Sequence, residues 1–431
     1  MTKLWLTVIW LLAFVPWQAQ AELVIEITGG TEAALPIAIV PFGNTGFAPP
    51  EDISHVISND LARSGRFAPL PQQDLISQPH EKAQINFQDW RLLRSEGLLV
   101  GKVDSIDGET YQVQFQLFDV YKAQQLVGKR YQVPASGLRR LAHQIADQVY
   151  QALTGEIGVF STRLAFVTAI KNVDGTKRFA LQVSDSDGAN PRTVLQSKQP
   201  IMSPNWSPDG EQLTYVSFEN GNAEVFVQEM TSGRRNSVAA FKGLNSAPSW
   251  SPDGKKLALT LSKAGNPEIY VLELATGRLA RVTHNSQAID TEAVWMPNGN
   301  ELVFTSDRGG RPQIYKVPAI GGRAERLTFE GSYNASPDIS PDGHMMTMVH
   351  VQNGKFYIAV QDLATGAVQV LTDTGRDESP SFAPNGRVIL YATEQKGKGV
   401  LAAVSVDGRI HQRLGESGSE VREPAWSPIR K

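Results

Sequence analysis

Five carboxylates and one guanidinium stand at corresponding points of a segment that the chain repeats, and these residues could do chemistry. The carboxylates are Asp290, Glu292, Asp377, Glu378 and Glu423, and the guanidinium is Arg422. Carboxylates gathered around one opening can bind a cation, or a partner protein that presents basic loops. The sequence therefore predicts an acidic binding surface, with ordinary solvated loops as the alternative.

Patterns typical of catalytic or metal sites are missing from the sequence. Its seven histidines are scattered, and none forms an HExxH or HxH pair. There is no GxSxG nucleophile turn, Walker loop or GxGxxG after a strand. Asp209, Asp253 and Asp342 recur regularly, but each lies in a Pro-Asp-Gly sequence that favours a turn. We expect no enzyme activity, no protein-ligated metal and no cofactor, although a divalent cation such as calcium could enter a central channel.

A short phrase built on Trp-Ser-Pro-Asp-Gly recurs six times and organises the chain. Its second proline falls at Pro208, Pro252, Pro297, Pro341, Pro384 and Pro428. The steps are 44, 45, 44, 43 and 44 residues, which indicates repeats that bury their apolar faces against one another. Short strands separated by Gly-bearing turns favour four-stranded propeller blades. The tryptophans are expected to pack between blades, because Ile339 and Phe382 occupy the same slot.

The two ends of the repeat array complement each other. The last repeat has only its first strand, and residues 163–195, before the first repeat, have every strand except that one. A ring whose chain ends share one blade has no open unit. The sequence therefore predicts an all-β six-bladed β-propeller over residues 160–431, closed by the C-terminal strand.

Three further regions precede the ring: a signal peptide, an arm and a domain. Residues 1–21 have Lys3, an apolar run and the small-residue end Ala19-Gln20-Ala21, which is typical of a secretory signal peptide. That run is too short to span a membrane, and no other run comes close. Residues 36–155 read as alternating strands and helices, with enough length to bury one core. We expect an exported protein with an N-terminal α/β domain.

An extended arm at residues 22–35 links the signal peptide to this domain. Leu23, Ile25 and Ile27 alternate with their neighbours, and Gly29 and Gly30 follow as a loose tether. Such a segment can form an edge strand of the α/β domain. Alternatively, it can stay free and add itself to the sheet of a partner.

Net charge and cysteine content exclude some classes of partner and of fold. The formal net charge is −3, and no basic stripe appears, so nucleic acid is not expected as a partner. The chain has no cysteine and therefore no disulfide framework.

The signal peptide, the IAIVPF segment at residues 37–42, the WSPDG repeats and the final PAWSP together resemble the TolB family of the Tol–Pal system. Many propellers share WSPDG, so the order of the parts carries the resemblance. It implies a monomeric, non-catalytic docking protein of the periplasm that binds the lipoprotein Pal at the propeller mouth and TolA through the mature N-terminal arm. It also implies roles in outer-membrane integrity, invagination during cell division and bacteriocin import, with other outer-membrane or peptidoglycan-associated proteins as further partners.

The resemblance also implies which residues meet each partner. Pal would face Met202, Ser203, Leu244, Asn245, Ser246, Ala247, Thr291, Glu292, Asn334, Ala335, Asp377, Glu378, Val421, Arg422 and Glu423. TolA would bind Glu22, Leu23, Val24, Ile25, Glu26, Ile27, Thr28, Gly29, Gly30, Thr31, Glu32 and Ala33. Two other functions fit the same sequence: a glycan-binding propeller, and an accessory subunit of a periplasmic hydrolase.

Overall fold

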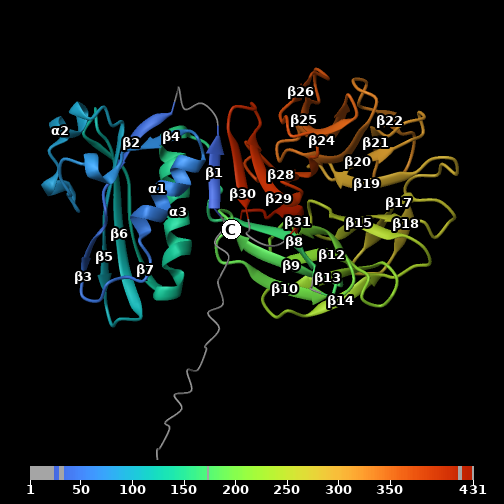
Figure 1. The fold of residues 1–431 in the computed structure, drawn as a ribbon, viewed down its shortest axis with the longest axis horizontal. Coiled ribbons are helices and arrows are strands. Elements are labelled where there is room, and N and C mark those ends of the chain that lie inside the picture. Colours follow the sequence, from blue (N-terminus) through green and yellow to red (C-terminus); the bar gives the residue numbers. More distant parts are fainter. Residues whose placement is uncertain (1–23, 29–33, 172–173, 416–419, 430–431) are drawn as a thin grey trace, which may run out of the picture.

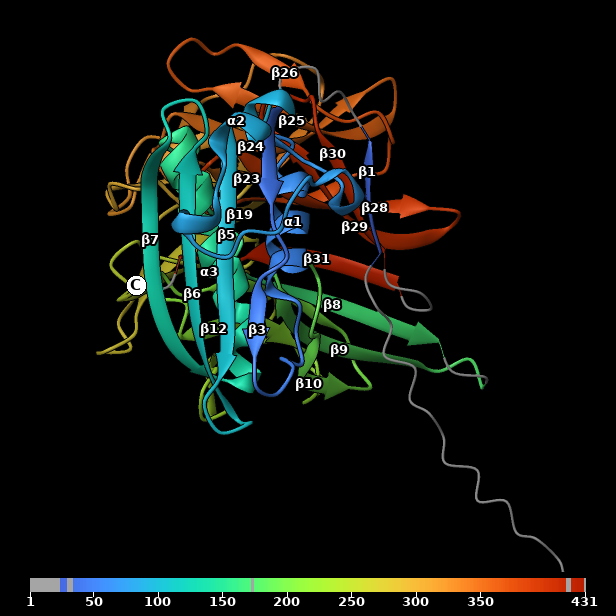
Figure 2. The ribbon, with the colours of Figure 1, turned by 90° about the vertical axis from the view of Figure 1, so that its left-hand side faces the viewer.

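The computed structural model describes residues 24–28, 34–171, 174–415 and 420–429. It shows an α/β domain beside a six-bladed β-propeller, as expected (Figures 1 and 2). The predicted signal peptide lies outside the described residues. So do Glu22, Leu23, Gly29, Gly30, Thr31, Glu32 and Ala33 of the predicted TolA-binding arm.

The α/β domain is a mixed sheet with helices on both faces. Its elements are β2 (Leu35–Ile39), β3 (Gly43–Thr45), α1 (Ile53–Arg63), β4 (Phe67–Pro69), η1 (Gln72–Asp74), η2 (Lys82–Gln84), α2 (Phe87–Leu92), β5 (Gly97–Ser105), β6 (Thr110–Asp119), β7 (Gln124–Pro134), η3 (Ala135–Gly137) and α3 (Leu138–Thr154). The strand order is β4-β2-β5-β6-β7, and β3 also pairs with β5. Alternate side chains of the central strands face α1 and α3 on one side and Trp90 of α2 on the other, so one sheet serves two cores.

Five blades of the propeller begin at the channel with their first strand. They are β11 (Ile201–Trp206) to β14 (Arg235–Ala239), β15 (Asn245–Trp250) to β18 (Leu279–Arg281), β19 (Asp290–Trp295) to β22 (Glu325–Arg326), β23 (Asn334–Ile339) to β26 (Val368–Val370), and β27 (Glu378–Phe382) to β30 (His411–Gly415). Their middle strands are β12 (Gln212–Ser217), β13 (Glu224–Glu229), β16 (Lys256–Leu261), β17 (Glu268–Glu273), β20 (Glu301–Ser306), β21 (Gln313–Pro318), β24 (Met345–Gln352), β25 (Lys355–Asp362), β28 (Val388–Gln395) and β29 (Lys398–Ser405).

The sixth blade joins the two ends of the ring, as predicted. It consists of β8 (Arg163–Lys171), β9 (Lys177–Asp185), β10 (Arg192–Ser197) and β31 (Glu420–Trp426), in the order β10-β9-β8-β31. Beyond the paired strands, the Arg163 amide donates to Ser427 Oγ and the Ser427 amide donates to the Arg163 carbonyl, each at 2.8 Å. The chain is therefore closed by backbone pairing between segments more than two hundred residues apart.

The repeated phrase builds a turn and an inter-blade contact. In the first copy, Asp209 accepts hydrogen bonds from the Ser207 hydroxyl and the Glu211 amide, and Gly210 takes the left-handed conformation with φ 69°. The tryptophan before the turn is buried, and Trp206 Nε1 donates to the Ala425 carbonyl of the neighbouring blade. The predicted structural roles of the aspartates and tryptophans are confirmed.

The described part of the arm corrects one expectation. β1 (Val24–Thr28) pairs antiparallel with β30 of the propeller, in a register from Val24↔Gly415 to Thr28↔His411. The alternative of an edge strand in the α/β sheet is therefore wrong. β30 is the outermost strand of its own blade, and its outer edge would otherwise leave backbone donors and acceptors unpaired.

Candidate functional site

The first strand of every blade contains a bulge at the central channel. In each bulge one non-glycine residue is left-handed, with φ between 47° and 56°. These residues are Ser203, Ala247, Glu292, Ser336, Ser379 and Glu423. Together with their neighbours they line a cavity of about 160 Å³ on the channel axis. Left-handed non-glycine residues are strained, and six at equivalent places mark the channel as a specialised region.

Two of the six bulge residues are glutamates, on blades that stand opposite each other in the ring. Glu292 accepts hydrogen bonds from Thr305 Oγ1 at 2.9 Å and from the Ser336 amide at 3.0 Å. Glu423 accepts one from the Ser203 amide at 3.1 Å. Each glutamate therefore holds the bulge of the next blade, and the repeat Ser-Ala-Glu-Ser-Ser-Glu around the ring places the two carboxylates on facing walls.

The channel is electrostatically unbalanced. Burial, with added repulsion from Glu378 and Glu292, raises the pKa of Glu423 above its usual value. Burial also raises the pKa of Asp338, in the channel wall, to about 6. Among the described residues, no Lys, Arg or His forms an ion pair with Glu292 or Glu423, so a cation entering here would meet uncompensated negative charge.

The predicted acidic surface needs a correction, because two of its five carboxylates are internal. Asp290 is fully buried and pairs with Arg308 Nη2 at 2.7 Å. Asp377 is also buried and accepts from Thr372 Oγ1 at 2.5 Å. These side chains hold the loops in place, which leaves Glu292, Glu378 and Glu423 as the carboxylates at the mouth, with Arg422 3.7 Å from Glu378.

The structure divides the predicted Pal-facing residues into two groups. The side chains open to solvent or to the channel are those of Met202, Ser203, Leu244, Ser246, Ala247, Thr291, Glu292, Glu378, Arg422 and Glu423. The buried ones are Asn245, Asn334, Ala335, Asp377 and Val421. Asn245 and Asn334 donate hydrogen bonds to the backbone carbonyls of Phe241 and Glu330 in the preceding loops, so they fix the conformation of the loops at the mouth.

An apolar arc, defined as Met202, Leu244, Ile289, Tyr333 and Phe356, borders the acidic opening over four blades. Met202, Leu244 and Ile289 are 41%, 36% and 51% exposed, and Phe356 stacks edge-on against Tyr333 with centroids 6.0 Å apart. Ile289 and Phe356 were not among the predicted contact residues. The signal for both was a large apolar residue in an otherwise polar loop on the mouth side.

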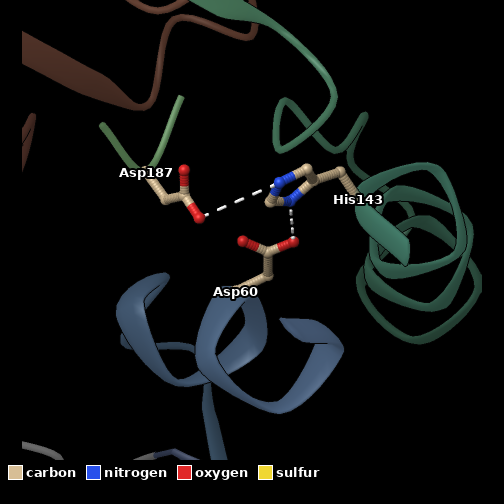
Figure 3. Close-up of side chains that lie close together, drawn as sticks. All are labelled: Asp60, His143 and Asp187. Atoms are coloured by element: carbon tan, nitrogen blue, oxygen red, sulfur yellow. Dashed lines mark hydrogen bonds and ion pairs between the residues drawn. The ribbon is translucent and has the colours of Figure 1, made fainter. Parts of the chain in front are cut away.

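A second acidic cluster lies between the two domains, on the far side of the ring from the mouth. Asp60 of α1, His143 of α3 and Asp187 of the β9–β10 turn point toward one another (Figure 3). Their ligand atoms lie within 4.8 Å of each other, a spacing compatible with a metal ion. However, Arg63 binds Asp60 at 3.0 Å and Arg139 binds Asp187 at 2.5 Å. With two cations already on its carboxylates, the cluster is an ion-pair network.

Comparison with known families decides where the chain belongs. The model of the TolB beta propeller domain matches residues 150–430, and that of the TolB amino-terminal domain matches residues 23–126. The chain belongs to the TolB family. The TolB amino-terminal match includes β1, so the arm falls within the family pattern as well as the two domains.

Individual relatives of the TolB family match over nearly the whole length. The "Tol-Pal system protein TolB" of Nitrosococcus oceani is 62% identical over 432 residues, covering 99% of both chains. That of Methylobacillus flagellatus is 54% identical, covering 95% of this chain and 94% of its own. The crystal structure of TolB from Acinetobacter baumannii superposes with a TM-score of 0.88 at 42% identity, over 95% of this chain and all of that one.

Within the described residues, no helix combines the length and apolar character needed to span a bilayer.

Proposed function

We propose that this TolB-family protein is a non-catalytic docking protein of the Tol–Pal system in the periplasm. Pal binds at the propeller mouth, and TolA binds through residues 22–33. In this way the protein supports outer-membrane integrity and invagination during division. The observation that carries the proposal is the mouth itself, where facing, uncompensated carboxylates are bordered by exposed apolar side chains.

The chemistry of the mouth suits a protein partner with a cationic centre. Burying the apolar arc contributes about 25 cal/mol per Å² of apolar surface covered. A basic side chain entering between Glu292 and Glu423 gains from the negative potential of the channel, and it also steers the encounter. A divalent cation such as calcium could occupy the same place when no partner is bound.

The arm suits exchange between two sheets. β1 is held by backbone pairing along five residues at the edge of a blade. An edge strand of another protein offers the same hydrogen bonds, so the arm can leave β30 and pair with a partner sheet. A partner at the mouth that favours one of the two arm positions would then control access of TolA to the arm.

The Pal site at the mouth is tested by shortening one apolar side chain and by neutralising one acidic side chain. Leu244→Ala and Glu423→Gln should each weaken binding of the purified Pal domain about tenfold, measured by calorimetry, because each removes about 1–2 kcal/mol of contact. Ile320→Ala is the matched control, since Ile320 is 97% exposed in a turn on the opposite face. Equal affinity of all three variants and the parent chain would contradict the Pal site.

The arm is tested by deletion of residues 22–33 from the exported chain. The shortened protein should retain Pal binding and fail to capture TolA. Binding to purified sacculi without Pal serves as the control for the glycan-binding alternative. TolA capture by the shortened protein would refute the role of the arm. It would leave the proposed Pal site at the mouth unaffected.

A further inference from the structure

His143 occupies an unusual place for an ionisable side chain, because it is buried between two aspartates that belong to different domains. Its ring is 2% exposed. Nδ1 lies 2.6 Å from Asp60 Oδ2 of the same domain, and Nε2 lies 3.8 Å from Asp187 Oδ2 of the propeller (Figure 3). Nε2 has no hydrogen-bond partner in the described structure. The imidazole therefore faces the propeller through its one unsatisfied nitrogen.

Charged groups surround this ring from every element packed against it. They are Asp60 and Arg63 of α1, Arg139 and Asp147 of α3, Asp185 at the end of β9, Asp187 of the β9–β10 turn, and Glu51 before α1. Arg139 bridges the domains by binding Glu51 at 3.0 Å and Asp187 at 2.5 Å. Asp147 accepts from the amides of Phe160 and Ser161 in the interdomain linker. Carboxylates outnumber guanidinium groups here, which favours a further positive charge.

The protonation state of His143 decides what it does to the interface. A neutral ring that donates from Nδ1 to Asp60 presents the Nε2 lone pair to the Asp187 carboxylate, and the two repel. A protonated ring presents an N–H and a positive charge to the same oxygen. Burial lowers the pKa of His143, but attraction to Asp60 and Asp187 outweighs burial, so the pKa lies above the usual histidine value.

We propose that His143 is a proton-operated latch between the α/β domain and the propeller. Its protonated ring joins Asp60 to Asp187 and holds the domains together, and loss of the proton weakens that contact. The interface is open to such control because it is incompletely filled. A cavity of about 370 Å³ lies beside it, lined by Arg63, Phe160 and Ile410 among others.

The latch connects to the arm through α1. Arg63, which binds Asp60, also donates to the Ser186 carbonyl at 3.1 Å and hydroxyl at 2.7 Å. The Arg63 carbonyl accepts from the Gln412 side chain of β30. Gln412 is paired with Ile27 of β1. Loosening the latch therefore disturbs the strand on which the arm rests.

The sign of the pH dependence follows from linkage. Separation takes Asp187 away from the ring and lets water screen Asp60, which lowers the pKa of His143, but it also relieves burial, which raises that pKa. Because the pKa in the closed form lies above the usual histidine value, the attraction to the carboxylates is the larger effect, and the closed form binds the proton more tightly. Closure is fully favoured below the open-form pKa, and the advantage is lost as the pH rises through the closed-form pKa. The closed-to-open ratio changes about tenfold for each unit between the two values.

The test measures domain separation in the exported chain against pH. The sequence has no cysteine, so Leu92→Cys and Ile320→Cys, at side chains 82% and 97% exposed, give one dye on each domain. Single-molecule energy transfer between pH 5.5 and 8.5 should show one closed population at low pH and a growing open population above the His143 midpoint. The titration midpoint of His143 is measured independently by NMR, from the change of its ring signal with pH. That signal is assigned by its absence from the spectrum of His143→Gln.

Three variants make the result decisive. His143→Gln should remove the pH response, and Asp187→Asn should move the midpoint to lower pH. His350→Gln is the matched control, because His350 is also buried but bonds to Asn334 inside one blade, and it should respond like the parent chain. An unchanged separation at all pH values, or a response shared by His143→Gln, would overturn the latch. A response abolished by a chelator would also overturn it, in favour of a bound metal.

Discussion

The channel mouth and the interdomain interface both gather acidic side chains, but their surroundings differ. At the interface, Asp60 and Asp187 are bound by Arg63, Arg139 and His143. At the mouth, Glu292 and Glu423 are held by backbone amides and hydroxyls, and no ion pair to them is found in the described residues. The first cluster joins two parts of one chain. The cluster at the mouth has negative charge that a cationic partner would neutralise.

This difference has an energetic consequence. A buried ion pair roughly offsets the cost of taking its charges out of water, but removing one partner leaves an uncompensated buried charge, which strongly destabilises the fold. Carboxylates crowded together without cations cost stability, which a fold tolerates where binding needs them. Neutralising substitutions should therefore have opposite signs in the two regions.

The largest effect is expected from Arg63→Ala. The change leaves the Asp60 carboxylate, whose side chain is 1% exposed, without its guanidinium, and it removes both bonds to Ser186. The free energy of unfolding should fall by about 3–5 kcal/mol, measured by urea denaturation. Arg234→Ala removes an exposed ion pair to Glu229 and should cost less than about 1 kcal/mol. Equal losses in the two variants would contradict the distinction between buried and exposed pairs.

The next effect is steric and concerns the same interface. Gly65 and Gly155 both follow a helix with positive φ, at 66° and 76°. A Cβ on Gly65 would lie 2.1 Å from Ile410 Cδ1 of the propeller, whereas nothing lies within 4 Å of one on Gly155. Gly155→Ala should cost about 1–2 kcal/mol from backbone strain, and Gly65→Ala about 1–3 kcal/mol more.

Thermal unfolding of the two glycine variants measures this difference. Their shared strain cancels, so the remainder reports the contact between the domains. A remainder of zero would mean that Ile410 moves aside without cost and that the close approach is unimportant for closure.

In the channel wall the sign should reverse. Asp338 has a pKa of about 6 because it is buried, and its Oδ2 accepts from the Phe382 amide at 2.7 Å. Asn205 makes the equivalent bond to Trp250 in another blade, so Asp338→Asn can keep the bond and lose the charge. The parent chain loses stability as the pH rises from 3.8 through about 6, and the variant does not.

Asp338→Asn should therefore match the parent chain near pH 4 and exceed it by about 1–2 kcal/mol at pH 8. The gain is less than the full pKa shift implies, because Asp338 is only partly buried and lines the channel cavity, where solvent screens its charge. Urea denaturation at the two pH values measures this. Destabilisation at pH 8 would show that the carboxylate is needed for the fold.

The smallest effect is expected from Glu423→Gln. Burial and the repulsion from Glu378 and Glu292 raise its pKa, so neutralising it relieves an unfavourable charge. The melting temperature should rise slightly, by the equivalent of about 0.5 kcal/mol, while Pal binding weakens. Loss of both stability and binding would mean that the bond to Ser203, rather than the charge, is what matters.

The periodic features of the fold could be predicted from the sequence because they depend on local chemistry. Pro-Asp-Gly fits a turn wherever it occurs, and a constant step near 44 residues specifies one blade after another. The missing first strand before residue 163 and the surplus one at the C-terminus predicted the closure that β31 and β8 make. The sequence also predicted an α/β domain with one core, but not that its sheet would bury a core on each face.

The site could be predicted only in outline, because sequence position does not determine burial. Asp290 and Glu292 are two residues apart, yet one is enclosed with Arg308 and the other lines the channel. Ile289 and Phe356 join one arc only when the ring brings their loops together.

By itself, the sequence determined the number of blades, the way the ring closes and the order of the domains, since turns, strand periodicity and repeat length are local properties. Tertiary structure decided the rest. It placed β1 on β30 instead of on the α/β sheet, because the outer edge of the β27–β30 blade lies within reach of the arm. It also set His143 between Asp60 and Asp187, a position created only where the α/β domain meets the propeller.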